Sequence, residues 1–227
     1  MKKKVFYTEL CYLLALPILA IGTALMERAN FGMSMVVAPA YLLHLVISPT
    51  LSFFSFGMAE YLLQLALLIA MALILRRAKL SYLLSFVTAV LYGFTLDASI
   101  ALIGLIPGGG MVQRILFYLL GMLFCCIAIA LFFKTYIPTE AYELFVKELS
   151  EKTGIPITRF KTIYEIISCA VAIAMSFIFF GFGHFEGVKL DTVLCALVNG
   201  WGIGMCSKAL EHMFEFKDAL KLRRLFC

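Results

Sequence analysis

The sequence predicts an all-α transmembrane protein with six spans. These form two inverted three-span repeats, each with a short non-spanning helix after its first span. Hydrophobic residues make up 63% of the 227 positions and charged residues only 15%, and mean hydropathy is +1.00. These values lie far outside the range of soluble domains. A helix needs about 20 apolar residues to cross the hydrocarbon core, so the length allows roughly six spans and no separate soluble catalytic domain.

The first predicted repeat covers residues 1–106. Its first span ends at Glu27 and Arg28, because two adjacent charges are costly inside the bilayer without partners. The apolar segment 34–47 follows and is too short to cross the membrane. It contains Pro39 and suits either a re-entrant or an interfacial segment, two alternatives that the residues leave open. The spans of this repeat are expected at about 7–26, 51–75 and 80–103.

The second predicted repeat covers residues 111–216 and follows a turn at Pro107–Gly110, where three glycines after a proline end any helix. The charged segment 138–152 cannot cross lipid, and Pro138 favours a helix start. We therefore expect a surface helix there. The remaining expected elements are spans at about 115–133, 160–182 and 190–210, a turn at 181–187 and a basic cytoplasmic tail at 217–227.

Lysine and arginine residues decide the predicted orientation. Six spans place both termini and the loops at 76–79 and 134–161 on one side, which holds nearly all of the basic residues. An excess of basic residues marks the cytoplasmic side. We therefore expect a multi-pass protein of the cell inner (plasma) membrane, with its N- and C-termini in the cytoplasm.

The two halves also resemble each other locally. Glu60 aligns with Glu165 at an offset of 105 residues, and Thr88 aligns with Asn199 at an offset of 111. Each half has three crossings, an odd number, so the second half is inserted upside down relative to the first. Inverted repeats with short segments in corresponding places point to a transporter whose site lies where the repeats meet. Chance similarity between apolar helices is the alternative.

The run from Gly22 to Gly32, GTALMERANFG, suggests a family. It resembles the first-span pattern of the YczE/YyaS/YitT group of bacterial membrane proteins, and the resemblance extends over most of the chain. That group tends to continue Gly-x-Ser-Pro, whereas this chain reads Gly32, Met33, Ser34 and Met35 and delays its proline to Pro39. The resemblance implies a bacterial inner-membrane protein, and most of the group has no assigned substrate.

Two carboxylates inside predicted spans are the main candidate site residues. Glu60 and Asp97 both fall in the outer half of the membrane, at depths that would let them share a cavity. An unpaired carboxylate there must be paired, protonated or hydrated. One interpretation is a cation, proton or amine site with Arg28 as a neighbour. The other is a structural ion pair between Arg28 and either carboxylate.

Three further residues complete the predicted substrate-binding or ion-binding set. Glu165 lies near the cytoplasmic end of its span, where it can also reach the surface. Thr88 and Asn199 lie near mid-span and are candidates to line the repeat interface, although hydrogen bonds between helices explain them equally well.

Other kinds of chemistry find no support in the sequence. The three histidines lie far apart, and neither a metal site, a catalytic nucleophile nor a phosphate-binding loop is recognisable. We therefore expect no enzyme activity, no catalytic residue and no cofactor. The basic residues follow the cytoplasmic helix ends, which anionic lipid explains without nucleic acid.

The predicted function is a small secondary transporter or permease for a small polar or charged solute, working by alternating access at the repeat interface. Its expected partners are the solute or ion and the lipid bilayer, and a homo-oligomer is left open. The alternative is a non-transporting membrane accessory or regulatory protein that serves a biosynthetic or export partner.

Overall fold

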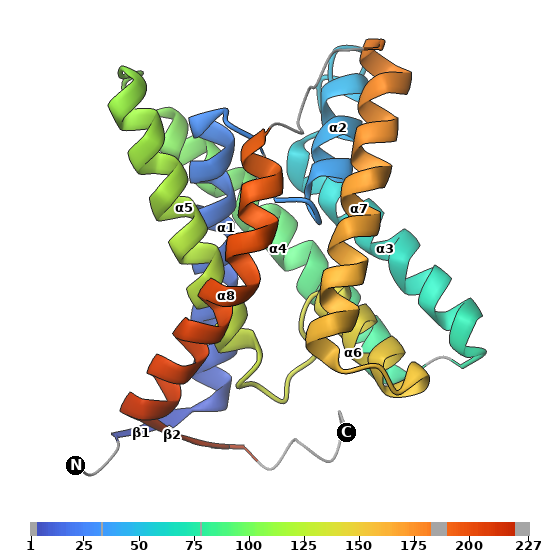
Figure 1. The fold of residues 1–227 in the computed structure, drawn as a ribbon, viewed down its shortest axis with the longest axis vertical. Coiled ribbons are helices and arrows are strands. Elements are labelled where there is room, and N and C mark those ends of the chain that lie inside the picture. The colour runs from blue at the N-terminus through green and yellow to red at the C-terminus, as the bar shows by residue number, and fades with distance from the viewer. Residues whose placement is uncertain (1–3, 33, 78, 183–189, 221–227) are drawn as a thin grey trace.

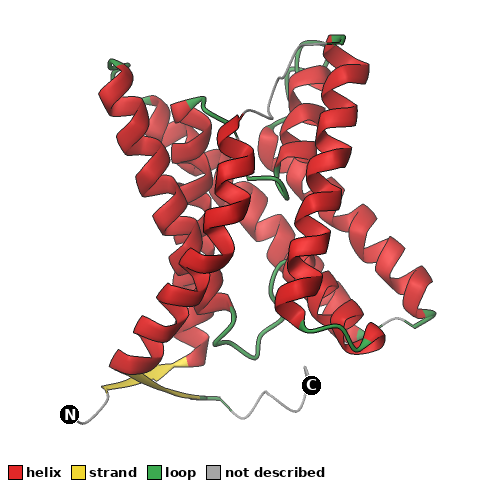
Figure 2. Ribbon diagram, in the orientation of Figure 1, coloured by secondary structure: helices red, strands yellow, loops and turns green. Residues whose placement is uncertain are grey.

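Helices dominate the structure, a computed structural model that describes residues 4–32, 34–77, 79–182 and 190–220 (Figure 2). For residues 157, 158 and 190–198 it describes the backbone only. The helices are α1 (Thr8–Ala29), α2 (Ala38–Ile47), α3 (Phe56–Leu75), α4 (Leu80–Gly104), α5 (Met111–Phe132), α6 (Ala141–Thr153), α7 (Ile157–Phe180) and α8 (Leu190–Met213). The strands are β1 (Lys4–Tyr7) and β2 (Phe214–Lys217).

Within the described residues, five helices are long and apolar enough to cross a membrane: α1, α3, α4, α5 and α7. The chain is therefore a multi-pass membrane protein. The sixth predicted span, 190–210, coincides with α8, which has 24 residues. This helix is not among the five, so the sixth crossing stays a prediction.

The helices pack as two groups that share a central contact. Helices α1, α4, α5 and α8 form one group, in which α1 packs on both α4 and α5, and α5 packs on α8. In the other group α2 packs on α3 and α7, and α6 packs on the same two helices. Contacts of α4 with α3 and α6, and of α7 with α8, join the groups. The short helices α2 and α6 lie at opposite ends of the molecule (Figure 1).

Glycines allow two close helix crossings. A Cβ atom on Gly22 of α1 would lie 2.9 Å from the carbonyl oxygen of Gly121 on α5. A Cβ atom on Gly57 of α3 would lie 2.1 Å from the carbonyl oxygen of Gly93 on α4. Small residues let membrane helices approach until their backbones touch. The second crossing sets α3 against α4 directly beside the buried polar residues of α3.

The segment at 34–47 forms a shorter helix than its apolar run. Backbone bonds from Val37 and Ala38 to the Ser34 carbonyl form a turn before α2 begins. The start of α2 is buried, with Ala38 and Ala40 fully inaccessible to solvent. Because α2 packs on α3 and α7, it lies within the helix packing rather than along the outside of the molecule.

The segment predicted as a surface helix, 138–152, is packed against other helices along one face. Helix α6 begins at Ala141 and contacts α3, α4 and α7. It buries Tyr142, Leu144 and Val146, so only part of its circumference faces outward. Two of its acidic residues, Glu140 and Glu148, are buried and bonded to partners from distant parts of the chain.

A two-stranded parallel sheet was not predicted. Strand β1 precedes α1, β2 follows α8, and the register pairs Lys4 with Phe214 and Tyr7 with Lys217. The sheet lies at the same end of the molecule as α6 (Figure 1). Most of the predicted tail, residues 221–227, and residues 183–187 of the predicted turn lie outside the described residues.

Candidate functional site

Two buried carboxyl groups from different elements share the interior between α3 and α6. The Tyr142 hydroxyl donates to Glu60 Oε2 at 2.9 Å. The Gln64 side-chain amide donates to Glu140 Oε2 at 3.4 Å and accepts from the Ala141 backbone N–H at 3.0 Å. We refer to Glu60, Gln64, Glu140 and Tyr142 as the carboxyl cluster.

The carboxyl cluster is sealed from solvent in this conformation. Glu60 and Gln64 are 0% exposed and Glu140 is 3% exposed. The second oxygen of each carboxyl group, Oε1 of Glu60 and Oε1 of Glu140, has no hydrogen-bond partner among the described residues. An ionised carboxylate left in this state costs several kcal/mol. Both groups are therefore expected to be neutral while the cluster stays closed.

Glu140 is the member of the cluster that precedes a short helix instead of sitting within a span. Burial, followed by the nearby carboxyl groups of Glu143 and Glu60, raises the pKa of Glu140 well above its ordinary value. The hydrogen bond from Gln64 acts in the opposite direction and is the weaker influence. Burial thus favours the protonated form of Glu140.

The local backbone explains how Glu140 reaches the interior. On α4, Ser85 Oγ donates to the Thr139 carbonyl at 2.5 Å, and Thr88 Oγ1 donates to the Pro138 carbonyl at 3.0 Å. These bonds hold the extended segment before α6 against α4. Glu140 occupies the N-cap position but makes no capping bond with its side chain. Gln64 accepts the first N–H of the helix instead, which leaves the Glu140 carboxyl group free to face α3.

A small pocket lies directly beside the cluster. Its lining includes Tyr142 and Glu143 of α6 and Lys161 and Tyr164 of α7, together with Val36, Phe133 and Val146. Lys161 Nζ lies 3.6 Å from Glu143 Oε1 and has no hydrogen bond among the described residues. It also lies 5.4 Å from the centre of the Phe133 ring. Tyr142 belongs to both the pocket and the cluster, and it links them.

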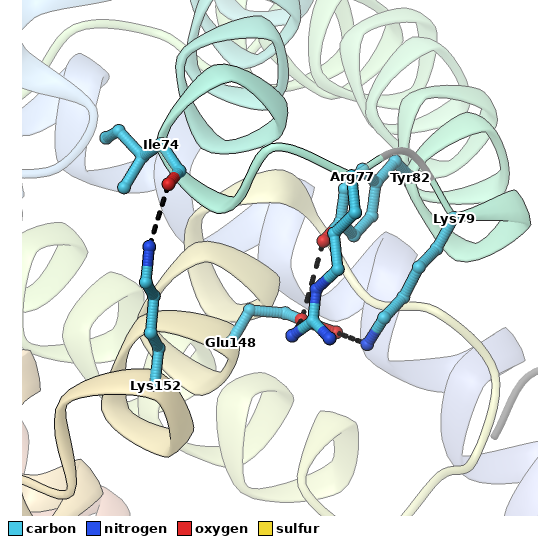
Figure 3. Close-up of polar contacts among 6 residues, drawn as sticks. All are labelled: Ile74, Arg77, Lys79, Tyr82, Glu148 and Lys152. Atoms are coloured by element: carbon cyan, nitrogen blue, oxygen red, sulfur yellow. Dashed lines mark hydrogen bonds and ion pairs between the residues drawn. The ribbon is translucent and has the colours of Figure 1, made fainter.

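Polar contacts anchor the far end of α6 to the loop between α3 and α4. Glu148 accepts from Lys79 Nζ at 2.6 Å, Arg77 Nη2 at 3.3 Å and the Tyr82 hydroxyl at 3.4 Å. Lys152 Nζ donates to the Ile74 carbonyl at 2.8 Å. Figure 3 shows these groups converging from the two elements. The anchor holds α6 in place and so fixes the position of Glu140 at its start.

Asp97 does not share its bonds with Glu60, contrary to the prediction of a common site. Asp97 Oδ1 accepts from the Gly57 backbone N–H at 2.8 Å, and its Oδ2 accepts from Ser55 Oγ at 2.5 Å. Both partners belong to the first turn of α3 or its cap. Asp97 therefore stabilises the start of α3, where backbone N–H groups lack partners within the helix.

Arg28 forms neither of the predicted ion pairs in the described part of the chain. Its Nη2 donates to the Ile106 carbonyl at 2.9 Å, after the end of α4, and the side chain is exposed. The prediction failed because depth along a span does not determine which way a side chain points. Arg28 lies at the last turn of α1, from which it reaches the loop before α5.

The other predicted residues divide between two places. Thr88 lies next to the carboxyl cluster through its bond to Pro138, and its hydroxyl also lies 2.8 Å from that of Tyr12. Asn199 lies at the α5–α8 contact, where Cys126 Sγ is 3.2 Å from its Oδ1. Glu165 is buried on α7, one helical turn after Lys161. The structure thus brings only Glu60 and Thr88 of the six predicted residues to the cluster.

The sequence analysis missed Gln64, Glu140 and Tyr142. One signal for Gln64 was present, because it lies four residues after Glu60 and so on the same face of an apolar helix. Glu140 and Tyr142 carry no such signal, since a carboxylate just after a proline is typical of an exposed helix start. Among the described residues, no group of three or more His, Cys, Asp or Glu side chains is placed to hold a metal ion.

Comparison with known families identifies the chain at the family level. Residues 6–208 match a family of unknown function, DUF6198. The protein belongs to this family. The match carries no specific link to the YczE/YyaS/YitT group, so that resemblance stays a prediction. No curated protein and no solved structure matches the chain.

Proposed function

We propose that this member of DUF6198 is a small secondary transporter that moves a small polar or charged solute through a site at the carboxyl cluster. The observation that carries the proposal is the pair of buried carboxyl groups with unpartnered oxygens, Glu60 on α3 and Glu140 before α6. Ionisable residues inside membrane proteins are costly, and they mark ion or substrate pathways more often than they mark packing.

The proposal includes an inverted repeat with six crossings, which the order and packing of the helices support. Helices α1 to α4 and α5 to α8 follow the same order, long, short, long, long, and the short members lie at opposite ends (Figure 1). Each short helix packs on the third helix of the other half of the chain, α2 on α7 and α6 on α3. Reciprocal packing of this kind is what an axis in the membrane plane generates. The cluster then lies where the first repeat meets the second.

In this scheme the two repeats rock against each other around the cluster. The described conformation is closed, because Glu60 has no exposed surface. Opening on the side of α6 requires the anchor at Glu148 to loosen, since it fastens α6 to the 76–79 loop. By the distribution of basic residues this side is cytoplasmic, in a bacterial inner membrane with both termini inside.

The experiment is a flux measurement on the purified protein in proteoliposomes. Solutes are first chosen by a thermal-shift screen against small metabolites, and those that stabilise the protein are tested for gradient-driven uptake. We expect Glu60→Gln to abolish both the stabilisation by the solute and its flux. Asp97→Asn is the matched control, because it also removes an intramembrane carboxylate but one that caps α3. Undiminished flux in the Glu60→Gln variant would overturn the proposed site.

One observation favours the alternative of a membrane accessory or regulatory protein. The carboxyl cluster is sealed, and a sealed polar cluster that never opens serves only to position helices. In that case the double variant Glu60→Leu/Gln64→Leu would fold, would bind its partner protein as the native chain does, and no solute would be transported by either form.

A further inference from the structure

We propose that Glu60 and Glu140 bind the protons that drive this transporter, and that Tyr142 connects Glu60 to the pocket beside α7. The inference rests on the proposed function, and it names the coupling ion and its route. Three features carry it: the two free carboxyl oxygens, the lack of a basic side chain paired with either carboxyl group in the described part of the chain, and the shared position of Tyr142.

The free oxygens suit a proton better than a metal ion. Glu60 Oε1 and Glu140 Oε1 are the two carboxyl oxygens of the cluster without a partner in the described structure. The Gln64 side chain is already engaged, because its carbonyl oxygen accepts from Ala141 and its amide donates to Glu140. Calcium takes six to eight oxygen ligands and magnesium demands a near-ideal octahedron. The two free oxygens supply few of these ligands, whereas each can carry one proton.

The neighbouring titratable groups do not supply a compensating charge. Those that interact with the cluster are Tyr12 of α1, Tyr92 of α4, Glu143 of α6 and Tyr164 of α7. His44 of α2 is bonded to the Phe54 carbonyl. On α7, Lys161 pairs with Glu143, and Glu165 adds another acid one turn later. The surroundings are therefore neutral or acidic, which leaves protonation as the way to keep the closed cluster uncharged.

Tyr142 offers a route for the proton. Its hydroxyl bonds to Glu60 Oε2 at 2.9 Å, while its side chain also lines the pocket with Lys161 and Glu143. In loading, the Tyr142 O–H bond breaks as the Glu60 O–H bond forms. The tyrosine oxygen then takes a proton from a hydronium ion in the pocket, which leaves as water, so tyrosine is regenerated. Lys161 and Glu143 line the mouth of this route with one charge of each sign.

Protonation of the cluster is coupled to closure by the energetics of burial. With both acids neutral, α3 and α6 can pack together without a buried charge. Loss of a proton leaves an uncompensated carboxylate, which favours a state in which water or a solute reaches the cluster. A conformational cycle that closes only when the acids are neutral moves protons in step with the rocking of the repeats.

The test is an infrared titration of the purified protein in lipid vesicles, with the carbonyl stretching band of protonated carboxyl groups as the signal. We expect two carboxyl groups that remain protonated at neutral pH and lose their protons under alkaline conditions. Glu60→Gln and Glu140→Gln should each remove one of them, and Asp97→Asn should remove neither. A band that keeps its full native intensity in either glutamine variant would overturn the proposal.

A second variant tests the route and does not remove a carboxyl group. Tyr142→Phe keeps the ring but lacks the hydroxyl, so the number of titrating groups should stay at the native value. The release of protons after a jump to alkaline pH should slow by on the order of a hundredfold. An unchanged rate would show that protons reach Glu60 by another path.

The outcomes separate this inference from the proposed function. In one outcome, solute flux does not depend on an imposed pH gradient and the carboxyl band does not depend on Glu60 and Glu140. This outcome would support the transporter function and contradict the proton site. A carboxyl band that depends on both residues, without flux of any solute that binds, would keep the proton site and reject the transporter.

Discussion

The two short helices, α2 and α6, differ in the type of residue that is buried at their N-termini. Helix α2 begins with Ala38, Pro39 and Ala40, all of them buried and apolar. Helix α6 begins after Glu140, whose carboxyl group is 3% exposed, and continues with Tyr142, whose hydroxyl reaches Glu60. Both helices lie against α3 and α7, and neither is long enough to be among the five candidate spans of the described residues.

This comparison shows that similar packing can serve two purposes. At α2 the chain turns inside the packing through backbone bonds to the Ser34 carbonyl. At α6 the chain needs Gln64 on α3 to accept its first N–H and to bind its carboxyl group. The short helix α2 therefore has a structural role, whereas α6 has a chemical role because it places an acid in the interior. Four predictions test this difference, beginning with the largest expected effect.

Placing a carboxyl group at the start of α2 should be the most damaging change. Ala38 is 0% exposed, and no amide equivalent to Gln64 is bonded to it in the described structure. Ala38→Glu should lower the free energy of unfolding by about 4 kcal/mol, because it buries an uncompensated acid. Denaturant titration in mixed micelles measures this loss. The control Ala38→Ser should cost about 1 kcal/mol, and equal stability of all three proteins would contradict the comparison.

Removing the amide that serves α6 should be the next largest effect. Gln64→Leu leaves the Ala141 N–H and one oxygen of Glu140 without their partners, at about 3 kcal/mol for the two groups. His44→Leu is the matched change beside α2, since His44 Nδ1 lies 3.0 Å from the Phe54 carbonyl. It should cost about 1 kcal/mol. If the histidine change proved the more costly in the same unfolding assay, the chemical role assigned to α6 would be wrong.

The third largest effect should be the pH dependence of stability caused by Glu140, which should exceed the effect of the ion pairs of Glu148. Burial raises the pKa of Glu140 in the folded protein, so its contribution to stability is fully present below the ordinary Glu value of about 4.3. That contribution is lost as pH rises through the raised pKa. The Glu140→Gln variant has no carboxyl proton to lose at this position. The variant should therefore gain stability relative to the native protein with increasing pH, as measured by thermal unfolding across a pH series. Parallel pH profiles would show that Glu140 is ionised in the folded state.

The smallest effect is expected at the anchor of α6. Glu148→Gln weakens the bonds to Arg77 and Lys79, whose side chains are 52% and 41% exposed. Solvent screens such pairs, so the loss should be about 1 kcal/mol and should shrink in high salt. The exposed neighbour Glu151 is the control, and Glu151→Gln should change stability by less than about 0.5 kcal/mol. A salt-independent loss in the Glu148 variant would assign it a role beyond the ion pairs.

Much of the helical layout could be predicted from hydropathy and helix breakers. The expected span at 80–103 coincides with α4 (Leu80–Gly104), and the expected segment at 34–47 contains α2. Helix ends follow local chemistry: α1 stops at Asn30 with a φ of 54°, and α6 stops at Gly154 with a φ of 71°. The sheet of β1 and β2 was missed because its strands are four residues each and lie more than 200 residues apart.

The candidate site was predicted less well than the helices. Glu60 was found because a carboxylate inside an apolar run is conspicuous at any depth. Asp97 was grouped with it by depth alone, yet its oxygens point to the first turn of α3. Glu140 was placed at the surface because its neighbours in sequence are charged. Its real neighbours are Gln64, 76 residues earlier, and Ser85, whose bond to Thr139 holds the segment inward.

The sequence by itself determined that this chain enters the membrane, where its helices break, and that Glu60 lies within an apolar helix. These properties follow from the cost of moving each residue type into hydrocarbon, and that cost depends on the residue and its immediate neighbours. Only the tertiary structure decided which carboxyl groups meet. An acid can cap a helix, as Asp97 does, or keep one oxygen without a partner among the described residues, as Glu60 and Glu140 do. Which of these occurs depends on the donors that distant segments bring to it.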